Sequence, residues 1–228
     1  MLYTRQSAME NIRNREGKRV FYLGKGDQLT NDARDFLTRE RISILPAEQA
    51  KPQGYRLLNG AAMTVKPEHM THLNAQVLVP KTHPRIAFRG AVDSLEAQLL
   101  LCQSIADEGF YKKLQDALDL ARLLIRCDVL EEPVPEKPLG GMDEKALRER
   151  SHRPQDFYGK PHFMPEGKAD RLLLQINLAR TQARNAELQA VRAFSDREGN
   201  PTRPDILQAL NRLSSYLYIL MIERKANQ

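Results

Sequence analysis

The sequence predicts an all-α fold, in which four long helices and one short helix form a bundle behind a small α/β extension. Two observations support this fold class. From residue 84 onward, apolar residues recur at spacings of three and four, the period of a helix that buries one face. Residues 1–60 instead combine short apolar runs with turns that contain glycine or proline. We therefore expect an N-terminal extension over residues 1–60 and a helical-bundle domain over residues 61–228.

The N-terminal extension is predicted from five short segments. The apolar run 20–23 favours a strand, residues 29–37 have helical spacing, and residues 42–45 favour a second strand. Residues 55–58 follow a proline and glycine linker and form a further candidate strand. The turn between the first strand and the helix, Gly24-Lys-Gly-Asp27, is similar to a phosphate-binding loop. It lacks the full Walker spacing, however, so a plain turn is the favoured interpretation.

Prolines and glycines separate the predicted helices of the bundle. In chain order the expected segments are a helix from Pro84 to Gly109, a helix over residues 111–129, the proline-rich segment 131–138, a short helix over residues 143–151, a loop over residues 154–167, a long helix rich in arginine, and a last helix that begins at residues 203–205. Helix starts at Pro84 and Pro204 are favoured because proline fits the first turn, where its missing N–H is not needed.

Composition limits the classes of function. The chain of 228 residues is long enough for a substantial core, so Cys102 and Cys127 are expected to be reduced, buried thiols. The net charge of +6 is modest, acidic residues alternate with basic ones, and tryptophan is absent, so we expect no nucleic-acid partner. No apolar run approaches the roughly 18 residues of a membrane span, so we expect no membrane partner and a cytoplasmic location. The spacing of His69, His72 and His83 does not support tetrahedral metal ligation.

The segment from Leu178 to Glu187 carries the strongest functional pattern. Arg180, Arg184 and Glu187 follow one another at spacings of four and three, which places them on one face of an otherwise apolar helix. Two guanidiniums and a carboxylate on one stripe suggest a polyanion site. Taken alone, the same stripe is equally consistent with a solvated face held by Arg–Glu pairs.

Two other predicted helices carry similar polar stripes. The helix after Pro84 has Arg89, Asp93 and Glu96, and the last helix has Asn211, Ser214, Ser215 and Tyr218. Three polar stripes on three apolar helices, with opposite charges that can pair, favour a cleft shared between helices or between subunits.

These stripes contain motifs of a known family. The motifs Leu178-Ala-Arg-Thr-x-x-Arg-x-x-Glu187 and Leu210-Asn-Arg-Leu-Ser-Ser-Tyr-Leu-Tyr218 resemble those of ATP:corrinoid adenosyltransferases of the trimeric, five-helix type. The segment from Lys81 to Ala97 is similar to a third family motif. The run from Arg203 to Ser215, together with Leu29-Thr-x-x-Ala-Arg34, is most similar to the ethanolamine-utilisation branch. The resemblance covers nearly the whole chain.

The resemblance implies roles for individual residues. Arg180 and Arg184 would contact the ATP triphosphate or fix its cradle, and Asp93 would pair with Arg180. The other implied binding residues are Thr71 and Lys81 for the phosphates, Asn211 for the nucleotide, and Glu187 as the carboxylate that closes the arginine motif. The family's glycine-rich loop before the threonine is replaced here by Lys66-Pro-Glu-His-Met-Thr71, and the His/Cys-rich motif of some ethanolamine-type members is absent, so no structural metal is predicted.

The family's reaction fits these residue types. Cob(I)alamin attacks the 5′ carbon of ATP and displaces a polyphosphate, so arginines and Mg²⁺ would stabilise the charge that develops on the leaving group. The family also excludes the lower axial ligand of cob(II)alamin with an apolar side chain. Phe163 is the candidate for that role here, although an aromatic residue in a loop also serves as a lid or a core anchor.

Three functional interpretations remain open at this point. The favoured one is a catalytic adenosyltransferase that acts as a homotrimer, binds ATP and a corrinoid, and receives its reduced substrate from a reductase. The second is a corrinoid or nucleotide carrier without turnover. The third is a basic helical interaction protein, which would bind nucleic acid with a steep salt dependence and ignore ATP.

Overall fold

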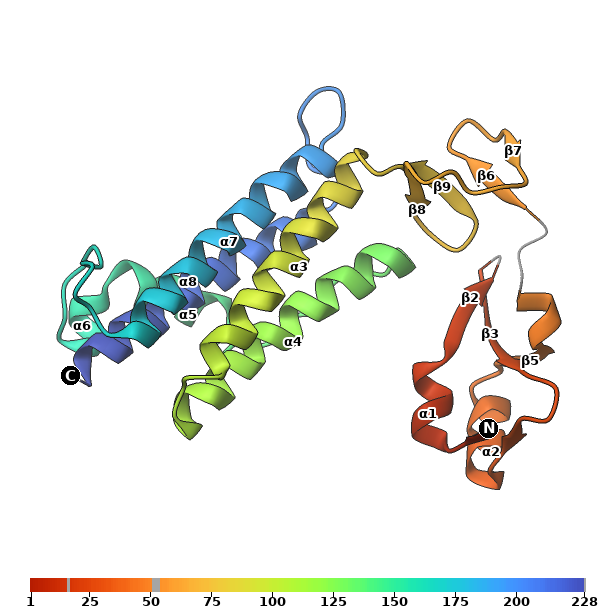
Figure 1. Ribbon diagram of the computed structural model, residues 1–228. Coiled ribbons are helices and arrows are strands. Elements are labelled where there is room, and N and C mark those ends of the chain that lie inside the picture. The colour runs from red at the N-terminus through yellow and green to blue at the C-terminus, as the bar shows by residue number, and fades with distance from the viewer. Residues whose placement is uncertain (16, 51–53, 228) are drawn as a thin grey trace. The chain divides into compact units, whose positions relative to one another are not determined.

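The computed structural model describes residues 1–15, 17–50 and 54–227, and it consists of two compact units, Met1–Lys81 and Thr82–Gln228 (Figure 1). The first unit mixes short helices and strands, and the second is helical, so the chain as a whole is predominantly helical, as predicted. In the sequence, the first compact unit ends at Lys81 and the second begins at Thr82. The domain boundary that the sequence predicted, at residue 60, stays a prediction.

The first part of the N-terminal unit is built on short strands and two short helices. Its elements are β1 (Leu2–Tyr3), α1 (Arg5–Glu10), β2 (Ile12–Arg15), β3 (Lys18–Leu23), β4 (Gln28–Leu29), α2 (Asn31–Arg39), β5 (Ser43–Pro46) and the 3-10 turn η1 (Ala47–Ala50). β3 pairs antiparallel with β2 and parallel with β5, and β1 pairs parallel with β4. The predicted strands at 20–23 and 42–45 and the predicted helix at 29–37 are thereby confirmed within a few residues.

A second sheet follows in the same unit. Its strands are β6 (Tyr55–Leu57), β7 (Ala62–Met63), β8 (Met70–His72) and β9 (Val77–Pro80), in the order β7-β6-β9-β8. Only the first of these strands was predicted. Its two halves are joined by a pairing between residues that are distant in sequence, because β6 lies parallel to β9 and Arg56 pairs with Val77.

The helices of the second unit are α3 (Pro84–Gln103), α4 (Glu108–Leu130), α5 (Glu144–His152), α6 (Pro154–Tyr158), α7 (Arg171–Ala193) and α8 (Pro204–Ala226). The most extensive packing joins α3 to α7, followed by α7 to α8 and α3 to α4. Figure 1 shows these four long helices lying alongside one another, with the short helices α5 and α6 beside α8. Among the described residues, no helix is both long enough and apolar enough to cross a membrane.

One predicted helix boundary was wrong, and one short helix was missed. The sequence analysis ended the first bundle helix at Gly109, but α3 ends at Gln103 and Gly109 lies in the first turn of α4. The reason is the side chain of Asp107, which caps α4 by accepting a hydrogen bond from the backbone N–H of Phe110 at 3.0 Å. The predicted loop over residues 154–167 also contains α6, which begins at a proline and ends at Gly159 with a φ of +63°.

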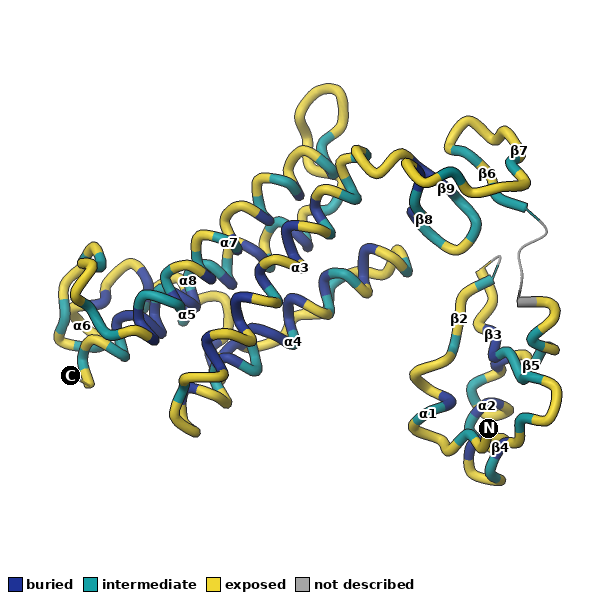
Figure 2. The backbone as a smooth tube through the Cα atoms, in the orientation of Figure 1, coloured by how far each residue is buried: buried dark blue, intermediate teal, exposed yellow. Residues whose placement is uncertain are grey.

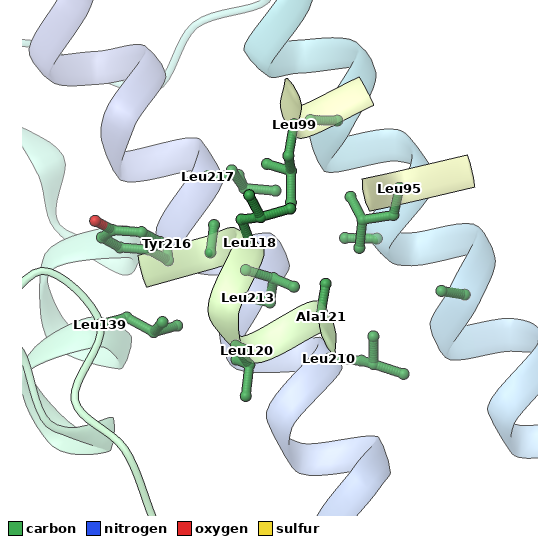
Figure 3. Packing of buried hydrophobic residues seen from close by; sticks show 14 of the residues in the cluster. Leu95, Leu99, Leu118, Leu120, Ala121, Leu139, Leu210, Leu213, Tyr216 and Leu217 are labelled. Atoms are coloured by element: carbon green, nitrogen blue, oxygen red, sulfur yellow. The ribbon is translucent and has the colours of Figure 1, made fainter. Parts of the chain in front are cut away.

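The core of the second unit is formed by apolar side chains from all four long helices. Buried segments recur along α3, α4, α7 and α8 in Figure 2. Figure 3 shows Leu95 and Leu99 of α3 near Leu118 of α4 and Leu217 of α8. Tyr216 joins this core with its hydroxyl satisfied, because it donates to the backbone oxygen of Lys113 at 3.0 Å. The polar residues that α3, α7 and α8 contribute to the predicted site therefore lie on helices whose positions are fixed by a well-packed interior.

Candidate active site on helices α7 and α8

Helix α7 carries the two arginines of the strongest sequence pattern. The helix begins at Asp170, whose carboxylate accepts a hydrogen bond from the backbone N–H of Leu173 at 3.1 Å. Its buried face consists of leucine and isoleucine near the start and of alanines further along. Arg180 and Arg184 lie beside this buried face, where Arg180 is partly buried and Arg184 is exposed.

The two arginines form a positive site that has no carboxylate partner among the residues that the structure describes. Arg180 donates from Nε and Nη2 to the side-chain oxygen of Asn177, at 3.2 and 3.0 Å. Burial lowers the pKa of Arg180, the neighbouring Arg184 lowers it further, and Tyr218 opposes the shift. Among the described residues, neither arginine takes part in an ion pair within 4.0 Å. Two adjacent guanidiniums with no compensating anion are the arrangement expected at a phosphate site.

The structure brings Glu187 and Asn211 together, a contact that the sequence analysis did not predict. The side-chain amide of Asn211 on α8 donates to the carboxylate of Glu187 on α7 at 3.1 Å. Glu187 is thus oriented by α8 and forms no ion pair with Arg184 in the part of the chain that the structure describes. The interpretation of the stripe as a set of Arg–Glu pairs is therefore not supported by this geometry.

The predicted ion pair between Asp93 and Arg180 is not formed in the structure. Asp93 is exposed on α3, and Arg180 is bonded instead to Asn177, which lies three residues earlier on its own helix. The other charged residues of the α3 stripe form ion pairs with α4. Glu96 accepts from Arg122 at 2.8 Å, and Arg89 donates to Asp128 at 2.6 Å. The α3 stripe is therefore paired with α4 in this structure, and the shared cleft stays a prediction.

Phe163 lies in the loop before α7 and is held against α8. Its backbone N–H donates to the hydroxyl of Tyr218 at 3.2 Å, and the two rings stack with centroids 6.2 Å apart. The ammonium of Lys225 lies 4.1 Å from the centroid of the Phe163 ring. The side chain is partly buried and packs against the helical core, so its predicted contact with the corrinoid stays a prediction.

Thr71 and Lys81 belong to the N-terminal unit, which is described separately from the arginine helix. Thr71 lies in β8 opposite Val79 and is partly buried. The side chain of Lys81 is exposed, and its backbone N–H donates to the oxygen of His69 at 2.9 Å. Their predicted role in binding phosphate stays a prediction.

The sequence analysis missed Asp128, which is fully buried in α4. Its carboxylate accepts hydrogen bonds from Nε of Arg85 at 2.8 Å and from Nε of Arg89 at 2.6 Å. The available signal was its position, one residue after the buried Cys127 and four after the buried Leu124, on the apolar face of a helix. A carboxylate at such a position requires a cationic partner. No group of three or more His, Cys, Asp or Glu side chains that could hold a metal ion occurs among the residues described.

The chain was compared with known proteins. A family model described as cobalamin adenosyltransferase matches residues 62–224. The corrinoid adenosyltransferase EutT of Salmonella typhimurium is 33% identical over 216 residues, which covers 95% of this chain and 80% of that protein. EutT of Escherichia coli K12 is 32% identical over an alignment with the same coverage.

Solved structures share the fold. A variant of the PduO-type ATP:corrinoid adenosyltransferase from Lactobacillus reuteri, complexed with cobalamin and ATP, matches with a TM-score of 0.55 and 20% identity over 71% of this chain and 91% of that chain. Another variant of the same enzyme, complexed with ATP, matches with a TM-score of 0.51. The family model and the similarity to EutT along almost the whole chain agree with the motifs on α3, α7 and α8, and the chain belongs to the cobalamin adenosyltransferase family.

Proposed function

We propose that this protein transfers the 5′-deoxyadenosyl group of ATP to the cobalt of cob(I)alamin and so makes adenosylcobalamin for ethanolamine utilisation. The observation that carries the proposal is the pair Arg180 and Arg184, which forms a positive site without an ion-pair partner among the described residues. This pair occurs in a member of the cobalamin adenosyltransferase family, and the relatives similar to it over most of their length are corrinoid adenosyltransferases.

The proposed reaction is a displacement at carbon. The electron pair of cob(I)alamin forms a cobalt–carbon bond to the 5′ carbon of ATP, and the bond from that carbon to the phosphate oxygen breaks. The electron pair of the broken bond leaves with the polyphosphate, so negative charge increases at the oxygen that departs. Fixed guanidiniums are most effective where such charge develops, because their orientation is set before the reaction begins.

The predicted polar site residues each have a place in this proposal. Arg180, held by Asn177, and the exposed Arg184 would bind the triphosphate, and Asn211 and Glu187 would bind the nucleoside end. Asp93 would act in the ATP-bound form, where Arg180 exchanges its contact with Asn177 for one to the triphosphate and to this carboxylate. Thr71 and Lys81 would bind phosphate, a role that the resemblance of their segments to the family implies.

Magnesium would be bound mainly through the triphosphate. The described residues hold no cluster of three or more metal-ligating side chains, whereas Mg²⁺ commonly takes one or two carboxylates together with substrate phosphates. Bound in this way, the cation would neutralise part of the charge on the leaving group. A separate reductase would supply cob(I)alamin.

We propose further that the long helices and α5 form the five-helix bundle of the trimeric adenosyltransferases, and that each active site lies between two subunits. Large apolar side chains are exposed on α7 and α3, namely Leu178, Leu188 and Val191 on the former and Leu100 and Leu101 on the latter. Exposed apolar surface of this kind favours contact with another protein surface. Light scattering with MgATP should give the mass of three chains, and a fully active monomer would refute the shared site.

The direct test of function is an anaerobic incubation of the protein with reduced cobalamin and MgATP. We expect the ultraviolet–visible spectrum of adenosylcobalamin to appear and to disappear on exposure to light, because the cobalt–carbon bond is photolabile. Binding of ATP and the corrinoid without product would support the carrier interpretation instead. Binding of nucleic acid with no response to ATP would support the basic interaction protein.

The residue test replaces each arginine by lysine. We expect Arg180→Lys and Arg184→Lys each to lower kcat/KM by about tenfold or more while the protein stays folded, because an ammonium cannot reproduce the planar, multi-donor contact of a guanidinium. Arg192→Lys is the matched control, since Arg192 lies exposed in the last turn of the same helix. Near-normal turnover of either site variant would remove that arginine from the triphosphate site.

A further inference from the structure

The loop that carries Phe163 is fastened to helix α8 through one hydroxyl group. Tyr218 Oη lies 3.2 Å from the backbone nitrogen of Phe163 and 3.1 Å from Nδ1 of His162. The other ring nitrogen of His162, Nε2, lies 3.1 Å from the backbone oxygen of His152 at the end of α5. One side chain of α8 therefore connects two consecutive loop residues, and the second of these is also tied to α5.

The direction of each hydrogen bond follows from the chemistry of the groups. The N–H of Phe163 can only donate, so the oxygen of Tyr218 accepts from it. The O–H of Tyr218 is then free to donate to Nδ1 of His162, and Nε2–H of His162 donates to the carbonyl oxygen of His152. All the groups are satisfied when His162 is the neutral tautomer with its proton on Nε2.

Ring contacts support the same arrangement. The rings of His162 and Tyr218 stack with centroids 5.7 Å apart and an interplanar angle of 11°. The Phe163 ring stacks on the same tyrosine at an angle of 26°, and Lys225 covers it with its ammonium group. The loop is thus held through its backbone as well as through its side chains, which fixes where the Phe163 ring is presented.

Tyr218 also belongs to the arginine site. It lies on the same stripe of α8 as Asn211, and it is close enough to Arg180 to influence the pKa of that guanidinium. A single residue therefore contacts the loop of Phe163 on one side and lies near Arg180, one of the two arginines proposed to bind the triphosphate, on the other.

We propose that Tyr218 is a positioning residue, whose hydroxyl holds Phe163 in place against the corrinoid. Because Tyr218 lies on the same helix as Asn211, it also fixes the position of the Phe163 loop relative to the ATP site. The proposal rests on the proposed function, because it assigns Phe163 to the corrinoid. His162 acts through Tyr218, because its Nδ1 accepts a hydrogen bond from the Tyr218 hydroxyl and thereby fixes the direction of that O–H.

The first experiment measures amide hydrogen exchange in the protein without substrates. Tyr218→Phe keeps the ring and removes only the oxygen, so we expect the amide of Phe163 to exchange about tenfold faster. Tyr111→Phe is the matched control, because Tyr111 is an exposed tyrosine of α4 whose hydroxyl makes no hydrogen bond among the described residues, and the exchange of Phe163 should not change. Unchanged exchange in Tyr218→Phe, or a rise spread over the whole of α8, would overturn the proposal.

The second experiment separates the two roles of His162. Asn places an oxygen near the position of Nδ1 and can still accept from Tyr218, whereas Leu cannot. We expect exchange of the Phe163 amide to stay within about threefold of wild type in His162→Asn and to rise about tenfold in His162→Leu. Equal effects of the two substitutions would show that His162 acts through volume alone and would refute its part in the proposal.

The third readout is kinetic. In an assay that starts from cob(II)alamin with a reductant, we expect Tyr218→Phe to lower turnover about tenfold while the KM for ATP stays within about twofold of wild type. A larger change in the KM for ATP than in turnover would place the tyrosine in nucleotide binding and overturn the positioning role. If the wild-type protein makes no adenosylcobalamin at all, the proposed function fails, whereas the exchange measurements still decide whether Tyr218 holds the loop.

Discussion

Removal of the buried carboxylate of Asp128 is the most demanding test of how the start of α3 is held. Asp128 is fully buried, and its two oxygens accept from Arg85 at 2.8 Å and from Arg89 at 2.6 Å. Arg85 makes a third bond, from Nη2 to the backbone oxygen of Asp128 at 2.8 Å. The side chains of the two arginines are only 17% and 15% exposed, so little solvent is available to replace the carboxylate.

The expected cost follows from this burial. Breaking a buried ion pair by removing one partner typically costs about 3–5 kcal/mol, because the remaining charge is left without compensation. Asp128→Ala removes the buried carboxylate from both arginines, although Arg85 keeps a longer contact to Glu131 at 3.5 Å. We therefore expect a loss of about 3–5 kcal/mol in the free energy of unfolding. Asp128→Asn keeps the shape and one acceptor oxygen, and it should cost about 2 kcal/mol.

The assay is urea denaturation, monitored by the circular dichroism signal of the helices. The slope m of the free energy of unfolding against urea concentration is compared between variants, to verify that the same cooperative transition is measured. Glu96→Ala is the matched control, since Glu96 also joins α3 to α4 through an ion pair, but its partner Arg122 is 51% exposed. That control should cost less than about 1 kcal/mol. If Asp128→Ala costs no more than the control, the arginines are solvated and the reasoning from burial is wrong.

Two further predictions concern stability. Hydrogen bonding by Arg203 lowers the pKa of Asp205 from 3.8 to about 2. The ionised carboxylate should therefore contribute about 2 kcal/mol to the free energy of unfolding above pH 4, and this contribution should be lost as the pH falls from 4 toward 2. Denaturation at a series of pH values should show this loss in wild type and less of it in Asp205→Asn; identical profiles would contradict the assignment. Gly140→Ala should lower the free energy of unfolding by about 2 kcal/mol, because φ is +58° and the new Cβ would lie 2.8 Å from the Tyr216 ring. Gly141→Ala, with φ of +74° and open space around it, should lower it by about 1 kcal/mol in the same denaturation assay. Equal costs at the two glycines would show that the contact with the ring is relieved by small shifts.

The helices were predictable because their signals are local. Pro84 and Pro204 occupy first turns, and apolar residues at spacings of three and four identify the buried faces. The end of α3 was not predictable in the same way. Gly109 is a helix-ending residue type, but Asp107 caps the next helix two residues earlier, and the cap determines the boundary. Pairing in the sheet of β6 to β9 joins residues about twenty positions apart, which no local pattern specifies.

In the candidate site, too, the sequence predicted which residues share a helix face but not which groups they bond to. The sequence predicted that Arg180, Arg184 and Glu187 share one side of α7, because that follows from helical geometry alone. It did not predict that Arg180 would be bonded to Asn177, because a rotamer is chosen by competition among all groups within reach. The contact of Tyr218 with the loop of Phe163 depends on how a loop folds back over 55 residues of chain, and sequence spacing carries no information about it.

The composition of α7 explains how the polar site coexists with tight packing. After its first turns, the buried face of the helix is made of Ala179, Ala183, Ala186 and Ala190, each fully buried. Alanine has a short side chain and loses no rotamer entropy, so neighbouring helices can approach closely at little cost. The two most extensive helix contacts of the protein, α3 with α7 and α7 with α8, both use this helix. Close approach is what lets the short amide of Asn211 reach Glu187 across two helices at 3.1 Å, so the small residues of the core determine the geometry of the site beside them.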